Sequence, residues 1–545
     1  MISKVTYTSN LKTLVNLFWT YFSVTIPGFI AIAFYSDFDI LLLYNFFESI
    51  FFCVLIILFI SVFKNSRVKK FIYYFLFSSF VFCTYIEAVY FVIYGTYFSP
   101  SSVFLFFDSN PEEATEFLTF YFSTSLLIFT VILLIVYFLC LKQLQFLYHQ
   151  LPTFKRRDLM KSFVLMVMIF GFMRITKLID YNFPYLFLRS FIIYQNESKE
   201  FDVYKNNKNG NFKNIQKIPS NHKEVYVLVL GESTTKSHLG IYGYDRPTTP
   251  HLRSKKDEII LFQDVISPHT YSIGAVTKLL TLANYENPKV SSQGSIIQLL
   301  NAAGFETYWL SNQRPLGPYE SLITKLSASA DYSKFITTAI ARHSKTLDES
   351  LLNDLDIVLE ESKSNKIFIV LHLIGTHHNY QERYPASFNV FNGEVNSNFK
   401  SKESINKINH YDNAVLYNDF VVNAIIEKVK STNNNSFVLY LSDHGEELFK
   451  DRNMAGHNED TPTASMFEIP FMLWQSEKYK NYRSISIDIN RRYMTDDLFH
   501  SLADLMGIQS DRVNYKRSIF SNIFEERKRI VLDSIDYDTA FKSKE

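Results

Sequence analysis

The first third of this 545-residue chain contains five apolar stretches that are long enough, or nearly so, to cross a membrane as helices. A hydrocarbon layer of about 30 Å requires about 20 helical residues. The predicted spans are residues 15–35, 40–63, 71–94, 117–141 and 162–179. The fifth stretch carries Arg174 and Lys177 in its last turns, but long basic side chains at a helix end can reach the membrane interface. The sequence therefore predicts an N-terminal transmembrane domain of five helices.

The charges of the connecting loops predict the orientation of these spans. Lys and Arg residues cluster in 64–70, between the second and third spans, and in 142–161, around the fourth-to-fifth connection. By contrast, 96–116 contains four acidic residues and no Lys or Arg. Positively charged loops stay in the cytoplasm, so the chain after about residue 180 is expected outside it. No cleavable signal peptide is visible, and the first span is expected to remain as an anchor.

Composition narrows the kinds of partner and site. The formal net charge of +1 and the absence of a basic tract argue against nucleic-acid binding. The three cysteines, Cys53, Cys83 and Cys140, all lie in predicted spans, which excludes a Cys-based zinc site from the outer domain. Glu48 and Glu87 also lie in spans. Such acids serve as a proton relay, as satisfied inward-facing groups or as part of a lipid headgroup cavity, and no inverted repeat favours a transporter.

The remainder of the chain alternates between strand-like and helical patterns. After an interfacial connector at 180–222, the region 223–545 is predicted to form a separate outer domain, which leaves 1–179 as the transmembrane domain. The strand-like runs are 225–230, 259–265, 307–310, 367–373, 437–441 and 470–474. The helical patterns between and after them cover 295–302, 351–361, 411–429 and 495–506. This alternation predicts an α/β domain with a mostly parallel sheet and helices on both faces.

Two of the strand-like runs end in side chains that suit a metal ion. Glu232 follows 225–230, and Asp443 with His444 follows 437–441. Ligands of open α/β sheets bind beyond the carboxyl ends of the strands, so these two ends are expected to meet at one site. Zinc takes about four ligands from His, carboxylate and Cys side chains, and these residues supply three.

A hydroxyl group is the natural fourth ligand of such a site. A metal acidifies a bound hydroxyl and makes it a competent nucleophile near neutral pH. The candidates follow the strand-like run 259–265, in the segment SPHTYS at 267–272. Either Thr270 or Ser272 in this segment can supply the hydroxyl.

Five motifs carry a resemblance to a known family. In chain order they are GESTTKSHLGIYGYDRPTTPHL, ISPHTYSIGAVTKLLTLANYENP, LHLIGTHHNY, YDNAVLYND and LSDHGEE. Following five predicted spans, they resemble the membrane-anchored phosphoethanolamine transferases of Gram-negative bacteria, a branch of the alkaline phosphatase and sulfatase superfamily. The resemblance covers nearly the whole chain. It implies a multi-pass inner-membrane protein whose sulfatase-like catalytic domain lies in the periplasm.

The resemblance also implies an activity and its chemical groups. Such enzymes transfer phosphoethanolamine from phosphatidylethanolamine to lipid A, to core sugars of lipopolysaccharide or to another periplasmic acceptor, through a covalent intermediate at a zinc site. By motif, the zinc ligands are Glu232, Asp443 and His444, and the nucleophile is Ser272. The family usually has Thr at that position, and Thr270 remains the rival candidate.

Further residues match family positions around the substrate. His377 in GTH and His457 in GHN correspond to histidines that contact the phosphoryl group or a second metal, where they would neutralise developing charge or protonate the leaving group. Ser109 and Glu113, in LFFDSNPEE, correspond to the polar positions of the headgroup-binding loop. An Asn that related enzymes carry four residues before Ser109 is Leu105 here.

Two other classes of function remain as alternatives. One is a phosphoglycerol transferase or phosphohydrolase built on the same scaffold, and the other is a metal-free membrane protein that binds glycans. The intact set of acid, Asp-His pair and hydroxyl argues against the second. Sulfate ester hydrolysis is disfavoured, because the Cys/Ser-x-Pro-x-Arg context that sulfatases need is absent after Ser272.

Overall fold

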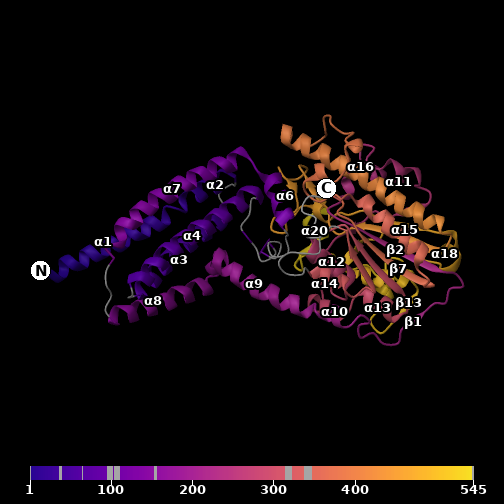
Figure 1. The fold of residues 1–545 in the computed structure, drawn as a ribbon, viewed down its shortest axis with the longest axis horizontal. Coiled ribbons are helices and arrows are strands. Elements are labelled where there is room, and N and C mark those ends of the chain that lie inside the picture. The colour runs from indigo at the N-terminus through magenta and orange to yellow at the C-terminus, as the bar shows by residue number, and fades with distance from the viewer. Residues whose placement is uncertain are drawn as a thin grey trace. The chain divides into compact units, whose positions relative to one another are not determined.

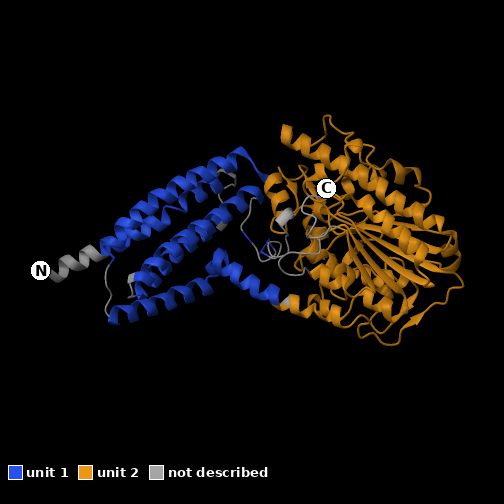
Figure 2. Cartoon of the chain, in the orientation of Figure 1, with its two compact units in different colours: residues 1–106, 121–195 blue, residues 107–120, 196–545 orange. Residues whose placement is uncertain are grey.

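The computed structural model describes residues 2–35, 40–63, 66–94, 98, 102–103, 111–151, 156–313, 322–336 and 346–542. The chain forms two compact units, residues 1–106 with 121–195 and residues 107–120 with 196–545 (Figure 2). Residues 107–120, which the predicted boundaries assign to the transmembrane domain, group with the larger unit. The short segment before the fourth span therefore packs as part of the α/β unit.

The smaller unit is a bundle of apolar helices. Its long helices are α1 (Ile2–Phe22), α2 (Ile26–Tyr35), α3 (Ile40–Val62), α4 (Ser66–Tyr94), α7 (Thr124–Tyr148), α8 (Arg156–Ile175) and α9 (Phe183–Glu200), of which α9 continues into the larger unit (Figure 1). Four segments in the described chain are long and apolar enough to cross a membrane: Leu11–Ala33, Leu42–Val62, Arg67–Tyr94 and Thr124–Tyr148. These segments overlap the first four predicted spans and match a membrane domain of several crossings.

The structure does not confirm the fifth predicted span. Residues 162–179 lie mainly on α8, which is helical but is not among the four candidate spans. Charged side chains at both ends of α8 lower its hydropathy, and Lys177, with φ of 61°, ends the helical path before residue 179. The predicted start of the fourth span at 117 is also early. Ser123 caps α7 by accepting a hydrogen bond of 3.2 Å from the Leu126 amide, so the span begins at Thr124.

A seven-stranded sheet forms the centre of the larger unit. In spatial order its strands are β3 (Ile259–Leu261), β11 (Phe471–Gln475), β8 (Asn435–Ser442), β2 (Glu224–Gly231), β7 (Lys366–His372), β5 (Glu306–Ser311) and β6 (Tyr332–Phe335). The strands from β8 to β6 pair in parallel. Strand β11 is antiparallel to both of its neighbours, so the sheet is mixed at this edge.

Helices cover both faces of this sheet (Figure 1). One core joins Tyr226, Leu228 and Leu230 of β2 to side chains of α12 (Ser272–Leu280), α13 (Ile296–Ala302) and α19 (Leu498–Leu505). The other core joins the alternate β2 residues, Val225, Val227 and Val229, to α15 (Leu351–Glu361) and α16 (Lys402–Ser431). Because both faces are buried, β2 and β8 are apolar almost throughout, and their polar residues are confined to the strand ends.

Candidate active site

The two central strands end side by side. Strands β2 and β8 pair in parallel with Gly231 opposite Ser442, so Glu232 and Asp443 leave the sheet at the same edge. His444 follows at once, and one ligand atom from each of the three side chains lies within 4.8 Å of the others. All three residues are almost completely buried. The structure thus brings together the three metal-ligand candidates, although 210 residues separate the two strand ends.

A tight backbone arrangement holds Glu232 in place. Ser233 adopts a left-handed conformation with φ of 56°, which turns the chain sharply after Glu232. Gly375 packs against this turn, and a Cβ atom there would lie 2.7 Å from the Glu232 carbonyl oxygen. The neighbouring Thr376 amide donates a hydrogen bond of 3.0 Å to that same oxygen. The backbone of the GTH motif therefore packs against Glu232 and holds it in position. The first residue of the motif must be glycine, because a larger residue would collide with the Glu232 backbone.

The oxygen and nitrogen atoms of this cluster are suitable ligands for a metal cation. Asp443 Oδ1 accepts hydrogen bonds from the amides of Ser233 at 3.2 Å and His444 at 2.7 Å, but its Oδ2 is buried and has no hydrogen-bond partner among the described residues. His444 Nδ1 lies 2.8 Å from the Gly445 carbonyl oxygen, which assigns the proton to Nδ1. Its Nε2 is 3.2 Å from Glu232 Oε1 but forms no hydrogen bond within the described chain. An imidazole nitrogen and a carboxylate oxygen are ligands that zinc takes in proteins, and here one of each is buried without another partner in the described chain.

The same groups perturb one another's protonation when no ion is bound. Burial disfavours ionisation of Glu232, yet the polar contact and the charge of His444, whose Nε2 lies 3.2 Å from Glu232 Oε1, outweigh it and hold the Glu232 pKa well below its usual range. Burial, followed by repulsion from Glu232, raises the pKa of Asp443 to about 8. Burial opposes charge on His444, but the negative Asp443 and Glu232 raise the His444 pKa to about 10. A metal ion must therefore displace protons from Asp443 and His444.

This linkage predicts that zinc affinity rises with pH. The pKa values of Asp443 and His444 are both raised, so both groups hold a proton at low pH. As pH increases, these protons compete less with the metal ion for the two side chains. Between about pH 6 and pH 8 we expect affinity to increase about tenfold per pH unit for each proton displaced. Titration calorimetry of the purified protein in buffers of different ionisation enthalpy would count those protons. An affinity that stays constant over this range would contradict the assignment of Asp443 and His444 as ligands.

Ser272 is the hydroxyl that faces the cluster. Its Oγ donates towards both carboxylate oxygens of Glu232, at 3.0 Å from Oε1 and 2.9 Å from Oε2. Thr270 Oγ1, the rival, is buried without a hydrogen-bond partner in the described chain. Ser272 is also the first residue of α12, where the positive end of the helix dipole favours negative charge. The geometry favours Ser272 as nucleophile, and its role remains a prediction.

The two histidines carried over by motif have different environments. His457 Nδ1 lies 2.7 Å from Glu446 Oε2, and its ring centroid is 4.2 Å from that of His444. Burial lowers the pKa of His377 to about 3, which keeps the imidazole neutral. A neutral His377 can donate or accept a hydrogen bond to a phosphoryl oxygen, but it does not by itself neutralise charge. His457, oriented by a carboxylate, is the better candidate for the acid.

Sequence reasoning missed two residues that act on this cluster. Gln313 Nε2 donates to Glu232 Oε2 at 3.0 Å and to the Leu373 carbonyl at 2.9 Å. Glu446 holds His457 and accepts a hydrogen bond of 2.5 Å from the Tyr380 hydroxyl. Both carried a weak signal, because Gln313 follows the end of β5 and Glu446 directly follows the Asp-His-Gly turn.

The helix before the fourth span is linked to the candidate site through Arg383. In the larger unit, α6 (Pro111–Tyr121) presents Glu116, which forms an ion pair with Arg383. Arg383 also donates to the carbonyl oxygens of His377 at 3.3 Å and His378 at 3.0 Å. Of the predicted headgroup loop, Ser109 lies outside the described residues. Glu113 lies on α6, but its side chain is outside them as well.

A buried acid, an Asp-His pair and a hydroxyl lie together at the strand ends of an α/β sheet, an arrangement that suits a metal-assisted transferase or hydrolase. The pattern of the Sulfatase family matches residues 224–508. Phosphoethanolamine transferase EptC of Escherichia coli strain K12 is 30% identical over 488 residues, which cover 83% of each chain. The chain belongs to the phosphoethanolamine transferases of the sulfatase family.

Solved structures support the fold over both parts of the chain. The C-terminal periplasmic domain of E. coli EptC, solved in complex with Zn, is 34% identical and aligns with a TM-score of 0.58 over 60% of this chain and 96% of its own. The integral membrane protein lipooligosaccharide phosphoethanolamine transferase A of Neisseria meningitidis is 20% identical. It aligns with a TM-score of 0.65 over 95% of this chain and 97% of its own. The second match extends the common fold to the membrane helices.

Proposed function

We propose that this protein transfers phosphoethanolamine from phosphatidylethanolamine to a lipopolysaccharide acceptor, either lipid A or a core sugar, or to another periplasmic acceptor. The observation that carries the proposal is the position of Ser272 Oγ, at 3.0 and 2.9 Å from the two carboxylate oxygens of Glu232. Glu232 belongs to the same cluster as Asp443 and His444, whose Oδ2 and Nε2 atoms are buried without a hydrogen-bond partner in the described chain. A nucleophile and a cation site at one strand edge suit phosphoryl transfer.

Glu232, Asp443, His444 and Ser272 would hold zinc, and the zinc-bound E. coli relative supports this choice. Zinc would make the Ser272 hydroxyl more acidic and offset charge on the phosphoryl oxygens. Glu232 already accepts the Ser272 hydrogen bond, so the proton can leave towards this carboxylate. Gln313 holds the second Glu232 oxygen and fixes the orientation of the carboxylate.

The reaction then proceeds by two displacements at phosphorus. In the first, Ser272 Oγ forms a bond to phosphorus while the bond to the diacylglycerol oxygen breaks, and that oxygen takes a proton. We assign this proton to His457, and its contact of 2.7 Å with Glu446 Oε2, which orients the imidazole, supports the assignment. In the second, an acceptor hydroxyl attacks phosphorus, loses its proton, and the bond to Ser272 Oγ breaks. Ser272 recovers a proton and returns to its starting state.

The proposed location is the inner membrane, with the α/β unit in the periplasm. The loop charges and the periplasmic domain of the E. coli relative support this orientation. An N-terminus in the cytoplasm requires an odd number of crossings to place the larger unit outside. The proposal therefore requires α8 to cross the membrane although its hydropathy is lower than that of the other four helices.

The decisive experiment compares envelope lipids and glycans of cells with and without the protein. Mass spectrometry should find an added phosphoethanolamine on one acceptor in cells that make the wild-type chain and on none in cells that make Ser272→Ala at equal abundance. An added phosphoglycerol would instead support the alternative transferase on the same scaffold. Unchanged acceptors together with loss of a phosphate ester would indicate a hydrolase.

A further inference from the structure

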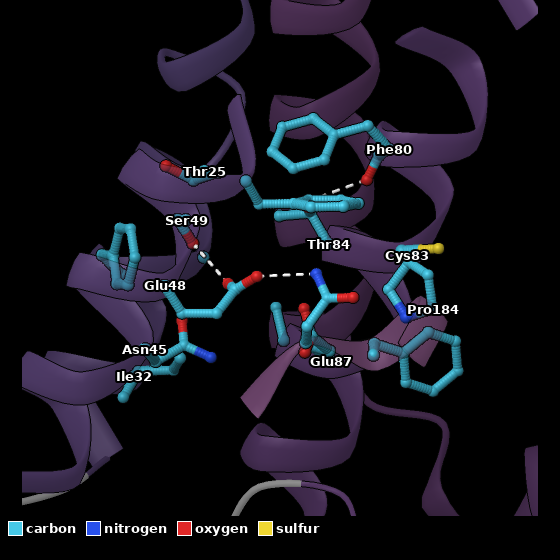
Figure 3. A pocket seen from close by; sticks show the side chains of 16 residues that line it. Thr25, Ile32, Asn45, Glu48, Ser49, Phe80, Cys83, Thr84, Glu87 and Pro184 are labelled. Carbon is cyan, nitrogen blue, oxygen red and sulfur yellow. Dashed lines mark hydrogen bonds between the residues drawn. The ribbon is translucent and has the colours of Figure 1, made fainter. Parts of the chain in front are cut away.

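A polar pocket lies inside the membrane domain, within the smaller unit. Helices α2, α3 and α4 and the first residues of α9 enclose it, and its walls include Glu48 of α3 and Glu87 of α4 (Figure 3). Asn45, Asn182 and the hydroxyl residues Thr25, Ser49 and Thr84 also line the pocket. Carboxyl groups are expensive within a membrane domain and are retained where they contact a partner, water or a ligand.

Only Glu48, of these two acids, accepts hydrogen bonds from the described part of the chain. Asn182 Nδ2 donates a hydrogen bond of 2.7 Å to Glu48 Oε1, and Ser49 Oγ donates one of 3.3 Å to Glu48 Oε2. Glu48 is 5% exposed. For Glu87 the described chain provides no hydrogen bond, and no Lys, Arg or His is among the residues that line the pocket. The pocket therefore holds two carboxyl groups without a basic partner.

A third polar group faces the same space without a partner. Asn45 is 6% exposed, lines the pocket and makes no hydrogen bond within the described part of the chain. Figure 3 shows Asn45 and Glu48 on the same side of the pocket. Asn45 and Glu87 therefore present polar atoms to the pocket that no hydrogen bond of the described chain occupies. An occupant that donates hydrogen bonds can satisfy the oxygens of both residues together.

The chemistry of the wall selects a cation with several N–H donors. A primary ammonium group has three donors and no acceptor, which suits the oxygens of Glu48, Glu87 and Asn45. Phe29, Phe52, Phe80 and Phe183 also line the pocket, and aromatic rings attract cations. An anionic group would meet two carboxyl groups and no compensating charge. We propose that this pocket binds the ammonium group of an aminophospholipid.

The position of the pocket along the helices favours a lipid that enters from outside. Glu48 lies eight residues after the start of α3 at Ile40, and Glu87 lies seven before the end of α4 at Tyr94. At 1.5 Å per residue, both acids lie about 10–12 Å from helix ends that the loop charges place on the periplasmic side. The choice of a phospholipid over another amine rests on the proposed function, because the proposed donor, phosphatidylethanolamine, carries an ammonium group in its headgroup.

Photocrosslinking with phosphatidylethanolamine that carries a diazirine near its headgroup tests the proposal directly. The full-length Ser272→Ala protein is used, in nanodiscs, so that transfer does not consume the probe. We expect crosslinks in the peptides of α3 and α4. The double change Glu48→Gln and Glu87→Gln should reduce them about tenfold, the effect of losing one charge-assisted contact. Asp158→Asn on α8 removes one carboxylate away from the pocket and should leave them unchanged.

Competition identifies the source of the ammonium group. Unlabelled phosphatidylethanolamine should displace the probe, whereas phosphatidylglycerol at the same concentration should not. Equal displacement by phosphatidylglycerol would overturn the ammonium assignment. Displacement by free ethanolamine at the concentration of the lipid would show that a soluble amine is the ligand and would overturn the lipid assignment.

A second variant guards against loss of folding. Asn45→Leu keeps the hydrogen bond between Glu48 and Asn182 and should still reduce crosslinking severalfold.

The inference fails if crosslinks are absent from α3 and α4 although the wild-type protein transfers phosphoethanolamine, because the proposed function would then stand without the pocket. Crosslinks there in a wild-type protein that transfers nothing would keep the pocket and refute the reaction.

Discussion

Replacing Asp443 with Ala is expected to abolish both zinc binding and transfer. The substitution removes the buried Oδ2 atom, which has no other partner in the described chain, and the acceptor that fixes the Ser233 and His444 amides. Changes to residues outside the ligand set already weaken metal affinity about 10- to 100-fold, so we expect a loss of more than 100-fold here. Metal analysis of the purified protein and transfer assays on the same samples would measure both effects.

The structure also predicts that this loss is not caused by unfolding. Burial, followed by repulsion from Glu232, raises the pKa of Asp443 in the metal-free protein, so its ionisation destabilises the fold. That destabilisation grows as pH rises from the normal Asp range towards the raised pKa of about 8. Metal-free Asp443→Asn should therefore melt at the same temperature as metal-free wild type, or higher, near neutral pH.

Asp354 provides a matched control for Asp443. Asp354 is also nearly buried, but it pairs with Lys334 on another part of the unit, so Asp354→Ala should retain zinc. Glu232→Ala should behave like Asp443→Ala, because Glu232 contacts both His444 and Ser272. Full transfer by a preparation shown to be free of metal would refute the zinc assignment.

Replacing Ser272 with Ala is expected to abolish the covalent intermediate while zinc stays bound. The change removes only the Oγ atom that lies 2.9 Å from Glu232 Oε2 and leaves the other three ligand candidates in place. Water can replace the hydroxyl as a ligand but not as the carrier of the phosphoryl group. Loss of a nucleophile costs about a thousandfold or more in rate.

The measurement is a peptide map of protein incubated with phosphatidylethanolamine and no acceptor. Wild type should carry phosphoethanolamine on Ser272, and Ser272→Ala should carry none with its zinc content unchanged. Ser272→Thr should keep part of the activity, since Thr retains the hydroxyl. Thr270→Val serves as the matched control, because the Thr270 hydroxyl has no hydrogen-bond partner in the described chain. An adduct on Thr270, or a normal rate for Ser272→Ala, would overturn the nucleophile assignment.

Much of the architecture can be predicted from the sequence because it depends on local patterns. The four candidate spans are continuous apolar stretches, and β2 and β8 are apolar runs that stop at a polar residue. Such runs are recognised one at a time, without knowledge of the rest of the chain. Parallel strands end at a common edge, so the meeting of Glu232 with Asp443 and His444 followed from the α/β pattern.

Other features depend on packing between distant segments and were not predictable. The antiparallel β11 is set by its pairing with β8, and local composition does not encode strand direction. The contacts of Gln313 with Glu232 and of Glu116 with Arg383 join segments 81 and 267 residues apart. No periodicity relates such pairs.

For this protein, the sequence alone determined the membrane domain, the α/β domain and the residue types of the candidate metal site, because burial and strand ends leave local patterns. Tertiary structure decided which hydroxyl faces the acid, since α12 begins at Ser272 and directs that side chain, not Thr270, to Glu232. It also decided that Glu48 and Glu87 line one pocket, because helices α3 and α4 must pack before two separate acids share a cavity.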